Sequence, residues 1–221
     1  MTMFNILYQY HEAFISGLTV TVELALIIWV FGLTIGTTIG VLASRFRTWV
    51  GIPARVASFF LSGIPVLVML YWAHYPLQVL LKVVINPFYT AAAVLTLINI
   101  FAIADLVLAH LRDFPEEYRV AAKVCGLTHR ETVLKIQLPI VLRQLIPALL
   151  PLQVVMLQST LFASLISVEE VFRVAQRINS VIYKPVEIYS ALGLLFIIVC
   201  LPVNGFALWL RARFTRNLSE T

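Results

Sequence analysis

The chain has 221 residues, of which 61% are hydrophobic and only 12% are charged, and its mean hydropathy is +0.94. A soluble domain usually carries about 25% charged residues, so this composition argues against a soluble protein and places most of the apolar surface against lipid. The formal net charge of +5 does not indicate nucleic-acid binding, because the basic residues are scattered between apolar stretches and form no stripe with aromatic residues.

Five apolar segments are long enough to cross a bilayer as helices, which takes about 20 residues each. In chain order they are 18–43, 53–75, 88–111, 142–167 and 189–210. Gly32, Gly36 and Gly40 in the first are spaced by four, which favours close packing of another helix. Gly63-Ile64-Pro65 interrupts the second. The sequence therefore predicts an all-α membrane protein with one domain, residues 1–221, and about five spans, with four or six as alternatives.

The basic residues are distributed unevenly between the two sides that these spans define. Twelve fall in the first and third connections and the C-terminal tail, and four fall in the other connections. Loops rich in Lys and Arg stay in the cytoplasm, so we expect the N-terminus outside and the C-terminus in the cytoplasm. The first seventeen residues contain no Lys or Arg, so we expect no cleavable signal peptide.

The third connection, 112–141, is the longest stretch outside the spans and is predicted to form two short amphipathic helices around a turn. Thr128 and Glu131 have the spacing of a capping box. Gly126 suits the left-handed position that ends a helix. An ordered helical hairpin between two spans indicates a cytoplasmic docking element, and a hairpin resting on lipid headgroups is the alternative.

Motifs of catalytic or metal chemistry are missing from the sequence. Cys125 and Cys200 are too few and too far apart for a disulfide framework or a metal-binding pattern. The four histidines lie in separate segments without ligand spacing: His11, His74, His110 and His129. Because there is no phosphate loop of the G-x-x-x-x-G-K-[ST] type, we expect neither ATP binding nor enzymatic activity from this chain itself.

Seven residues of the third connection have the spacing of the "EAA" loop of binding-protein-dependent ABC importer permeases, and six of them also resemble it in residue type. They are Val120, Ala121, Ala122, Gly126, Ile136, Leu138 and Pro139. The one departure is Val120, which stands where the family has glutamate. Other segments resemble the polar amino acid branch of that family, among them Gly17-Leu18-Thr19-Val20-Thr21, Gly63-Ile64-Pro65-Val66-Leu67 and Val168-Glu169-Glu170-Val171.

This resemblance implies a type I ABC importer permease fold in the bacterial inner (plasma) membrane and transport of an amino acid or similar small polar solute. It implies that residues 116–139 bind two cytoplasmic ATPase subunits, which would hold the ATP and Mg, so that no cofactor is expected in this chain. It also implies a second permease subunit and an extracytoplasmic solute-binding protein as partners, besides membrane lipid.

Candidate pathway residues are the polar groups inside the third and fourth spans. They are Asp105, Gln158, Ser159, Thr160 and Ser164. Ionisable groups at such depth usually face the protein interior or a water-filled path, so Asp105 is a candidate contact for a cationic group. A structural partner is the alternative for Asp105, and interhelical hydrogen bonds are the alternative for the band at 158–164.

Departures from the polar amino acid branch bear on which of two permease subunits contacts the charged groups of the solute. Leu108, Gln158-Ser159 and Leu161 replace residues that are usually charged or carry a hydroxyl. A zwitterion taken out of water needs partners for both charges, so we expect a heterodimer whose other subunit supplies most charged contacts. An unusual substrate is the alternative explanation of these departures. On the outer side, Glu169, Glu170 and Arg173 are expected to form a solvated ion-pair face or a docking site for the binding protein.

Two other classes of function remain open at this level. An ion-gradient-driven transporter would show internal repeats, and none is visible between the two halves of the chain. A non-transporting membrane assembly subunit would not need an ordered docking loop. Co-purification with an ATPase would separate these classes from an ABC importer permease.

Overall fold

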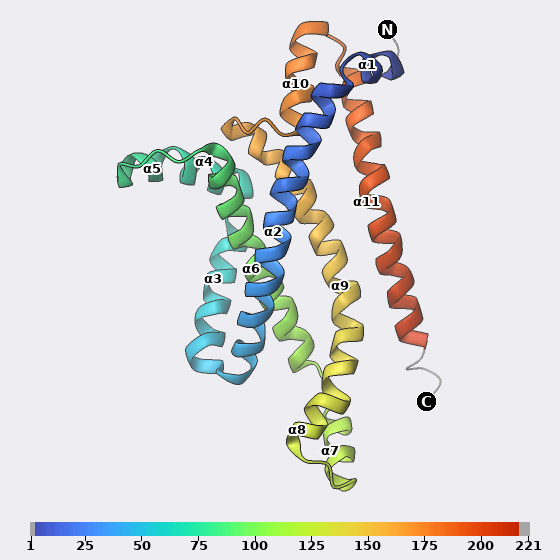
Figure 1. Ribbon diagram of the computed structural model, residues 1–221. Coiled ribbons are helices and arrows are strands. Elements are labelled where there is room, and N and C mark those ends of the chain that lie inside the picture. Colours follow the sequence, from blue (N-terminus) through green and yellow to red (C-terminus); the bar gives the residue numbers. More distant parts are fainter. Residues whose placement is uncertain (1–2, 217–221) are drawn as a thin grey trace.

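The computed structural model describes residues 3–216, which are helical almost throughout (Figure 1). Four helical segments are long and apolar enough to cross a membrane: His11–Arg45, Pro87–Arg112, Thr132–Ile166 and Pro185–Phe214. They contain α2 (His11–Arg45), α6 (Pro87–Arg112), α9 (Leu138–Ser159) and most of α11 (Pro185–Arg216). Four of the five predicted spans are thus confirmed. The outermost residues of the predicted domain, 1–2 and 217–221, lie outside the described residues.

The second predicted span, 53–75, is not one straight helix. After η1 (Arg47–Gly51), α3 (Ile52–Gly63) packs against α6, and then α4 (Val66–His74) and α5 (Pro76–Leu81) turn away. The bend is 96°, so α4 and α5 lie across the bundle (Figure 1). Ile64 is extended because the ring of Pro65 disfavours the helical conformation in the residue before it. Residues 3–216 therefore contain four helical segments that could span a membrane, or five spans if the bent pair counts as one.

The fourth predicted span, 142–167, changes helix type before it ends. α9 stops at Ser159 and continues as the tighter 3-10 helix η3 (Thr160–Ile166), which closes at Ser167 with φ 71°. The 3-10 helix has about three residues per turn, so residues four apart point in different directions. Thr160 and Ser164 therefore do not share a face, which corrects the relation predicted for an α-helix.

The two ends of the bundle carry different elements (Figure 1). α7 (Glu116–Val124), α8 (His129–Glu131) and η2 (Thr132–Gln137) project at the end where α6 and α11 finish. α1 (Met3–Gln9) and α10 (Val171–Ile182) lie at the opposite end.

α2 and α6 approach each other along the glycine stripe of α2. A Cβ on Gly36 would lie 2.6 Å from the carbonyl oxygen of Ile100, and one on Gly40 would lie 2.7 Å from Cβ of Val107. Such distances are too short for real side-chain atoms, so the interface fits only glycine. The predicted packing role of the stripe is confirmed.

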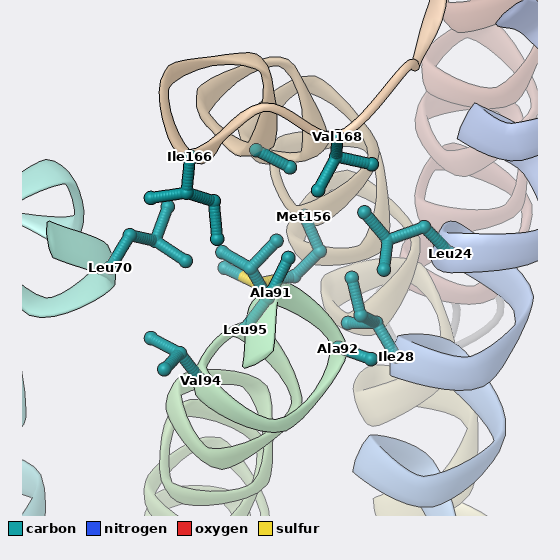
Figure 2. Close-up of a cluster of buried hydrophobic side chains, with 11 residues drawn as sticks. Leu24, Ile28, Leu70, Ala91, Ala92, Val94, Leu95, Met156, Ile166 and Val168 are labelled. Atoms are coloured by element: carbon teal, nitrogen blue, oxygen red, sulfur yellow. The ribbon is translucent and has the colours of Figure 1, made fainter. Parts of the chain in front are cut away.

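Buried side chains from separate helices meet beside the bend (Figure 2). The cluster includes Leu24 and Ile28 of α2, Leu95 of α6, Met156 of α9 and Ile166 of η3. Leu70 of α4 is fully buried in the same cluster. The transverse helix α4 is therefore anchored to the bundle by apolar contact.

Candidate coupling loop and membrane pathway

The coupling loop, residues 112–141, begins with α7, which ends in a left-handed glycine. Gly126 has φ +76°, and its amide donates to the carbonyl oxygen of Lys123 at 3.0 Å. The amide of Leu127 donates to the carbonyl oxygen of Ala122, also at 3.0 Å. This pair of hydrogen bonds is the Schellman motif, which closes helices where a glycine can adopt positive φ. The conformation predicted for Gly126 is confirmed.

The next helical turn begins at the capping box predicted from the sequence. The amide of Thr128 donates to Oε2 of Glu131 at 3.1 Å, and the amide of Glu131 donates to Oγ1 of Thr128 at 3.3 Å. Lys135 Nζ also donates to Oε1 of Glu131 at 2.9 Å. Hydrogen bonds from Lys135 and Thr128 lower the pKa of the exposed Glu131 carboxyl to about 2. The loop is therefore held in one local conformation by its own side chains.

The seven residues predicted for coupling lie within or next to this ordered hairpin, with different exposure. Ala122 is only 2% exposed and packs inside the hairpin. Val120 and Leu138 are 54% and 42% exposed, and Ala121 and Gly126 are exposed as well. Ile136 and Pro139 are half-buried. Val124 is also apolar and is 82% exposed. Exposed apolar side chains of this kind are typical of a surface that contacts a partner.

Asp105 contacts α3, and its role as a pathway residue stays a prediction. It is half-buried in α6, and Ser58 of α3 donates a hydrogen bond to its Oδ2. α6 ends and α9 begins at the end of the bundle that carries the coupling loop. Asp105 lies seven residues from that end of α6, whereas Thr160 lies 22 residues from the start of α9. At 1.5 Å per residue the two are roughly 20 Å apart along the bundle. The structure therefore does not bring Asp105 together with the polar band at 158–164.

The hydroxyls of the polar band are satisfied within their own helix. Ser159 donates to the carbonyl oxygen of Val155 at 2.8 Å, Thr160 to that of Leu157 at 2.7 Å, and Ser164 to that of Leu161 at 2.7 Å. All three of these hydroxyl side chains are buried, and Gln158 is exposed. A role for any of them in the pathway stays a prediction.

Sequence reasoning missed an amide pair that joins three spans. Asn99 of α6 donates to the carbonyl oxygen of Ile28 at 3.0 Å and to Oε1 of Gln153 at 3.1 Å. Gln153 of α9 donates back to Oδ1 of Asn99 at 3.3 Å, and Trp29 Nε1 donates to the Gln153 carbonyl oxygen at 3.1 Å. A Cβ on Gly32 would collide with the Asn99 amide. The glycine stripe therefore makes room for this polar contact.

A second polar group fastens the transverse arm, residues 66–85, to the start of α6. The Gln78 amide of α5 donates to Oγ1 of Thr90 at 3.1 Å. It also donates to Nδ1 of His74 at 3.0 Å in the tautomer in which Nδ1 carries no proton. Its Oε1 accepts from the amide of Ile85 at 2.8 Å. Gln78 is buried, so its satisfied amide stabilises the arm against the bundle.

Glu170 is fully buried, which corrects the expectation of a solvated ion pair with Arg173. Its two carboxylate oxygens accept from the amides of Phe172 at 2.9 Å and Arg173 at 2.8 Å, and so cap α10. Burial raises the pKa of Glu170 to about 7, although these hydrogen bonds favour the charged form. Glu169 does form the exposed ion pairs, with Arg173 at 3.9 Å and Arg177 at 3.2 Å.

The described residues thus form a helical membrane protein that crosses the bilayer several times and carries an ordered loop outside its spans. Between residues 3 and 216, no group of three His, Cys, Asp or Glu side chains is placed to hold a metal ion. Residues 32–216 match the model of the family described as "Binding-protein-dependent transport system inner membrane component", and the chain belongs to this family.

Relatives with assigned roles match most of the chain. The glutamine transport system permease protein GlnP of Escherichia coli K12 is 31% identical over 82% of this chain and 85% of its own length. The octopine transport system permease protein OccM of Rhizobium radiobacter is 29% identical over 87% of this chain and 82% of its own length. The histidine/lysine/arginine/ornithine permease HisQ of Salmonella typhimurium is 26% identical, covering 95% and 96%.

Solved structures show the same fold. An amino acid ABC transporter crystallised with histidines matches with a TM-score of 0.84 and 22% identity, over 94% of this chain and 96% of its own. The inward-facing methionine transporter MetNI matches with a TM-score of 0.73 and 18% identity, covering 93% and 98%. The chain therefore has the fold of these two transporter chains over more than nine-tenths of its length.

Proposed function

We propose that this chain is one of the two membrane subunits of an ABC importer that carries an amino acid or a similar small polar solute. The observation that carries the proposal is the coupling loop. The loop has EAA-like spacing and a fixed Schellman turn, and α7 exposes the apolar side chains of Val120 and Val124, one helical turn apart, outside the spans. GlnP, OccM and HisQ are permeases named for the transport of amino acids or their derivatives, which supports that solute class.

The chain would act as a permease without enzymatic activity of its own. Two ATPase subunits would bind the coupling loop and supply ATP and Mg, and a solute-binding protein would deliver solute at the α10 end. The basic asymmetry supports a cytoplasmic coupling loop and C-terminus and an external N-terminus. The family description supports a location in the bacterial inner membrane. Closing of the ATPases would move the loop and, through α6 and α9, alternate access to the pathway.

The second permease subunit is proposed to be a homologous, different chain. Ser58 already occupies Asp105, and the hydroxyls of Ser159, Thr160 and Ser164 already donate to carbonyl oxygens. Among these side chains a zwitterionic solute would find one charged group, Asp105, and hydroxyls that are already hydrogen-bonded. The other subunit would therefore supply most of the charged contacts. Two copies of this chain in a purified, transport-competent complex would refute the heterodimer.

Two variants of one residue test the docking role of the loop. Gly126→Val places a β-branched residue at φ +76°, where it is strongly disfavoured, while Gly126→Asn places there a residue that tolerates this conformation. We expect the valine variant to lose uptake and to co-purify with less ATPase, and the asparagine variant to keep most of both. Normal uptake and normal recovery of the ATPase with Gly126→Val would contradict the proposal.

A further inference from the structure

A cavity of about 550 Å³ lies between α6, α9 and α11 at the end of the bundle that carries the coupling loop. Its mouth is charged, because Asp113 follows the end of α6, Arg143 lies in the second turn of α9 and Arg211 lies near the end of α11. Its inner wall includes Ala109 and Pro151. Pro151 lies about 12 Å further along α9 than Arg143, at 1.5 Å per residue. The cavity therefore runs from charged span ends toward the apolar interior of the bilayer.

Two prolines add acceptors to this cavity. Pro147 and Pro151 lie inside α9 and both line the cavity. Proline has no amide hydrogen, so the carbonyl oxygens of Arg143 and Pro147 cannot receive the usual hydrogen bond from four residues further on. These oxygens and the exposed Asp113 carboxylate can accept hydrogen bonds from a cation, while the two guanidinium groups can bind an anion.

We infer that this cavity binds the headgroup of phosphatidylethanolamine, with its phosphate against Arg143 and Arg211 and its ammonium against Asp113. The acyl chains follow the apolar wall between α9 and α11 toward the bilayer interior. Basic pockets between the cytoplasmic ends of membrane helices are known lipid-binding sites, and the ends of these three spans place the charged residues at headgroup depth. The inference does not depend on which solute the chain carries.

The mixed charge of the mouth selects among lipid headgroups. Phosphatidylglycerol brings only negative charge, which Asp113 repels. Phosphatidylcholine has the same net charge as phosphatidylethanolamine, but its quaternary ammonium has no N–H to donate to Asp113 or to the carbonyl oxygens of Arg143 and Pro147. A zwitterionic amino acid has both charges but no acyl chain for the apolar wall.

The test compares lipids with identical acyl chains on the full chain, purified together with its co-purifying subunits. After delipidation in detergent, phosphatidylethanolamine, phosphatidylcholine or phosphatidylglycerol is added back, and native mass spectrometry counts the lipids retained. We expect the wild type to retain phosphatidylethanolamine about tenfold better than phosphatidylcholine, since hydrogen bonds to charged groups are the stronger kind. Equal retention of the two, or preference for phosphatidylglycerol, would overturn the inference.

Substitutions of the cavity residues test whether the preference for phosphatidylethanolamine arises at this cavity. Asp113→Asn should bring the ratio of phosphatidylethanolamine to phosphatidylcholine close to one, and Arg143→Gln should lower retention of both. Arg213→Gln is the matched control, because Arg213 lies on α11 over the Trp209 ring and does not line the cavity. An unchanged ratio in Asp113→Asn would refute the assignment. Displacement of the lipid by a millimolar free amino acid would instead show a site for small solutes, which also overturns it.

Discussion

Replacing Gly36 with alanine measures how much the close contact of α2 and α6 contributes to stability. The added Cβ would lie 2.6 Å from the carbonyl oxygen of Ile100 and 2.9 Å from Cβ of Ile103. One of these atoms belongs to the backbone of a buried helix and cannot move aside alone. Gly193→Ala in α11 is the matched control, since a Cβ there would meet nothing within 4 Å among the described residues.

Both variants exchange glycine for alanine within a helix, so the gain in helix propensity, up to about 1 kcal/mol, is similar in the two. Their difference isolates the overpacking at α6, which typically costs about 1–3 kcal/mol. For a chain of this size each kcal/mol lowers the midpoint of thermal unfolding by about 2–4 °C. Thermal melting of the two variants in the same detergent checks the difference. A midpoint for Gly36→Ala equal to or above that of Gly193→Ala would refute the close packing.

Three further outcomes are expected. Burial raises the pKa of Glu170 to about 7, so between about pH 4.5 and 7 the folded chain binds more protons than the unfolded chain. The free energy of unfolding therefore falls as pH rises through this window. Glu170→Gln should remove this dependence in melting curves at pH 5 to 8, and parallel curves for the two proteins would contradict it. Gln153→Leu should destabilise the chain by about 1–3 kcal/mol because the buried Oδ1 of Asn99 loses the donor that Gln153 supplies, and a melting midpoint within 1 °C of wild type would exclude such a contribution. In a cysteine-free background, Arg130→Cys should react with an impermeant thiol reagent only in opened cells and Ser180→Cys in intact cells; the reverse pattern would invert the proposed orientation.

The local sequence was sufficient to predict the long spans and the turn of the coupling loop. Hydropathy over about 20 residues finds a membrane span without knowledge of its neighbours, and four spans were found this way. The capping box of Thr128 and Glu131 and the positive φ of Gly126 depend on residues within five positions of each other. Such features are made by hydrogen bonds between near neighbours in the chain, so the local sequence is enough to predict them.

The tertiary structure alone decided which polar groups meet. Asn99 and Gln153 are 54 residues apart, and Asp105 and Ser58 are 47 apart. Their contact depends on the rotation and register of whole helices, which the span pattern does not specify. The same holds for Glu170, whose neighbours in sequence suggest a solvated ion pair, while packing of α10 against α2 buries it. Glycine and proline at 63–65 predicted an interruption, but only the tertiary structure gives the angle of 96° and places Leu70 in one buried cluster with α2, α6, α9 and η3.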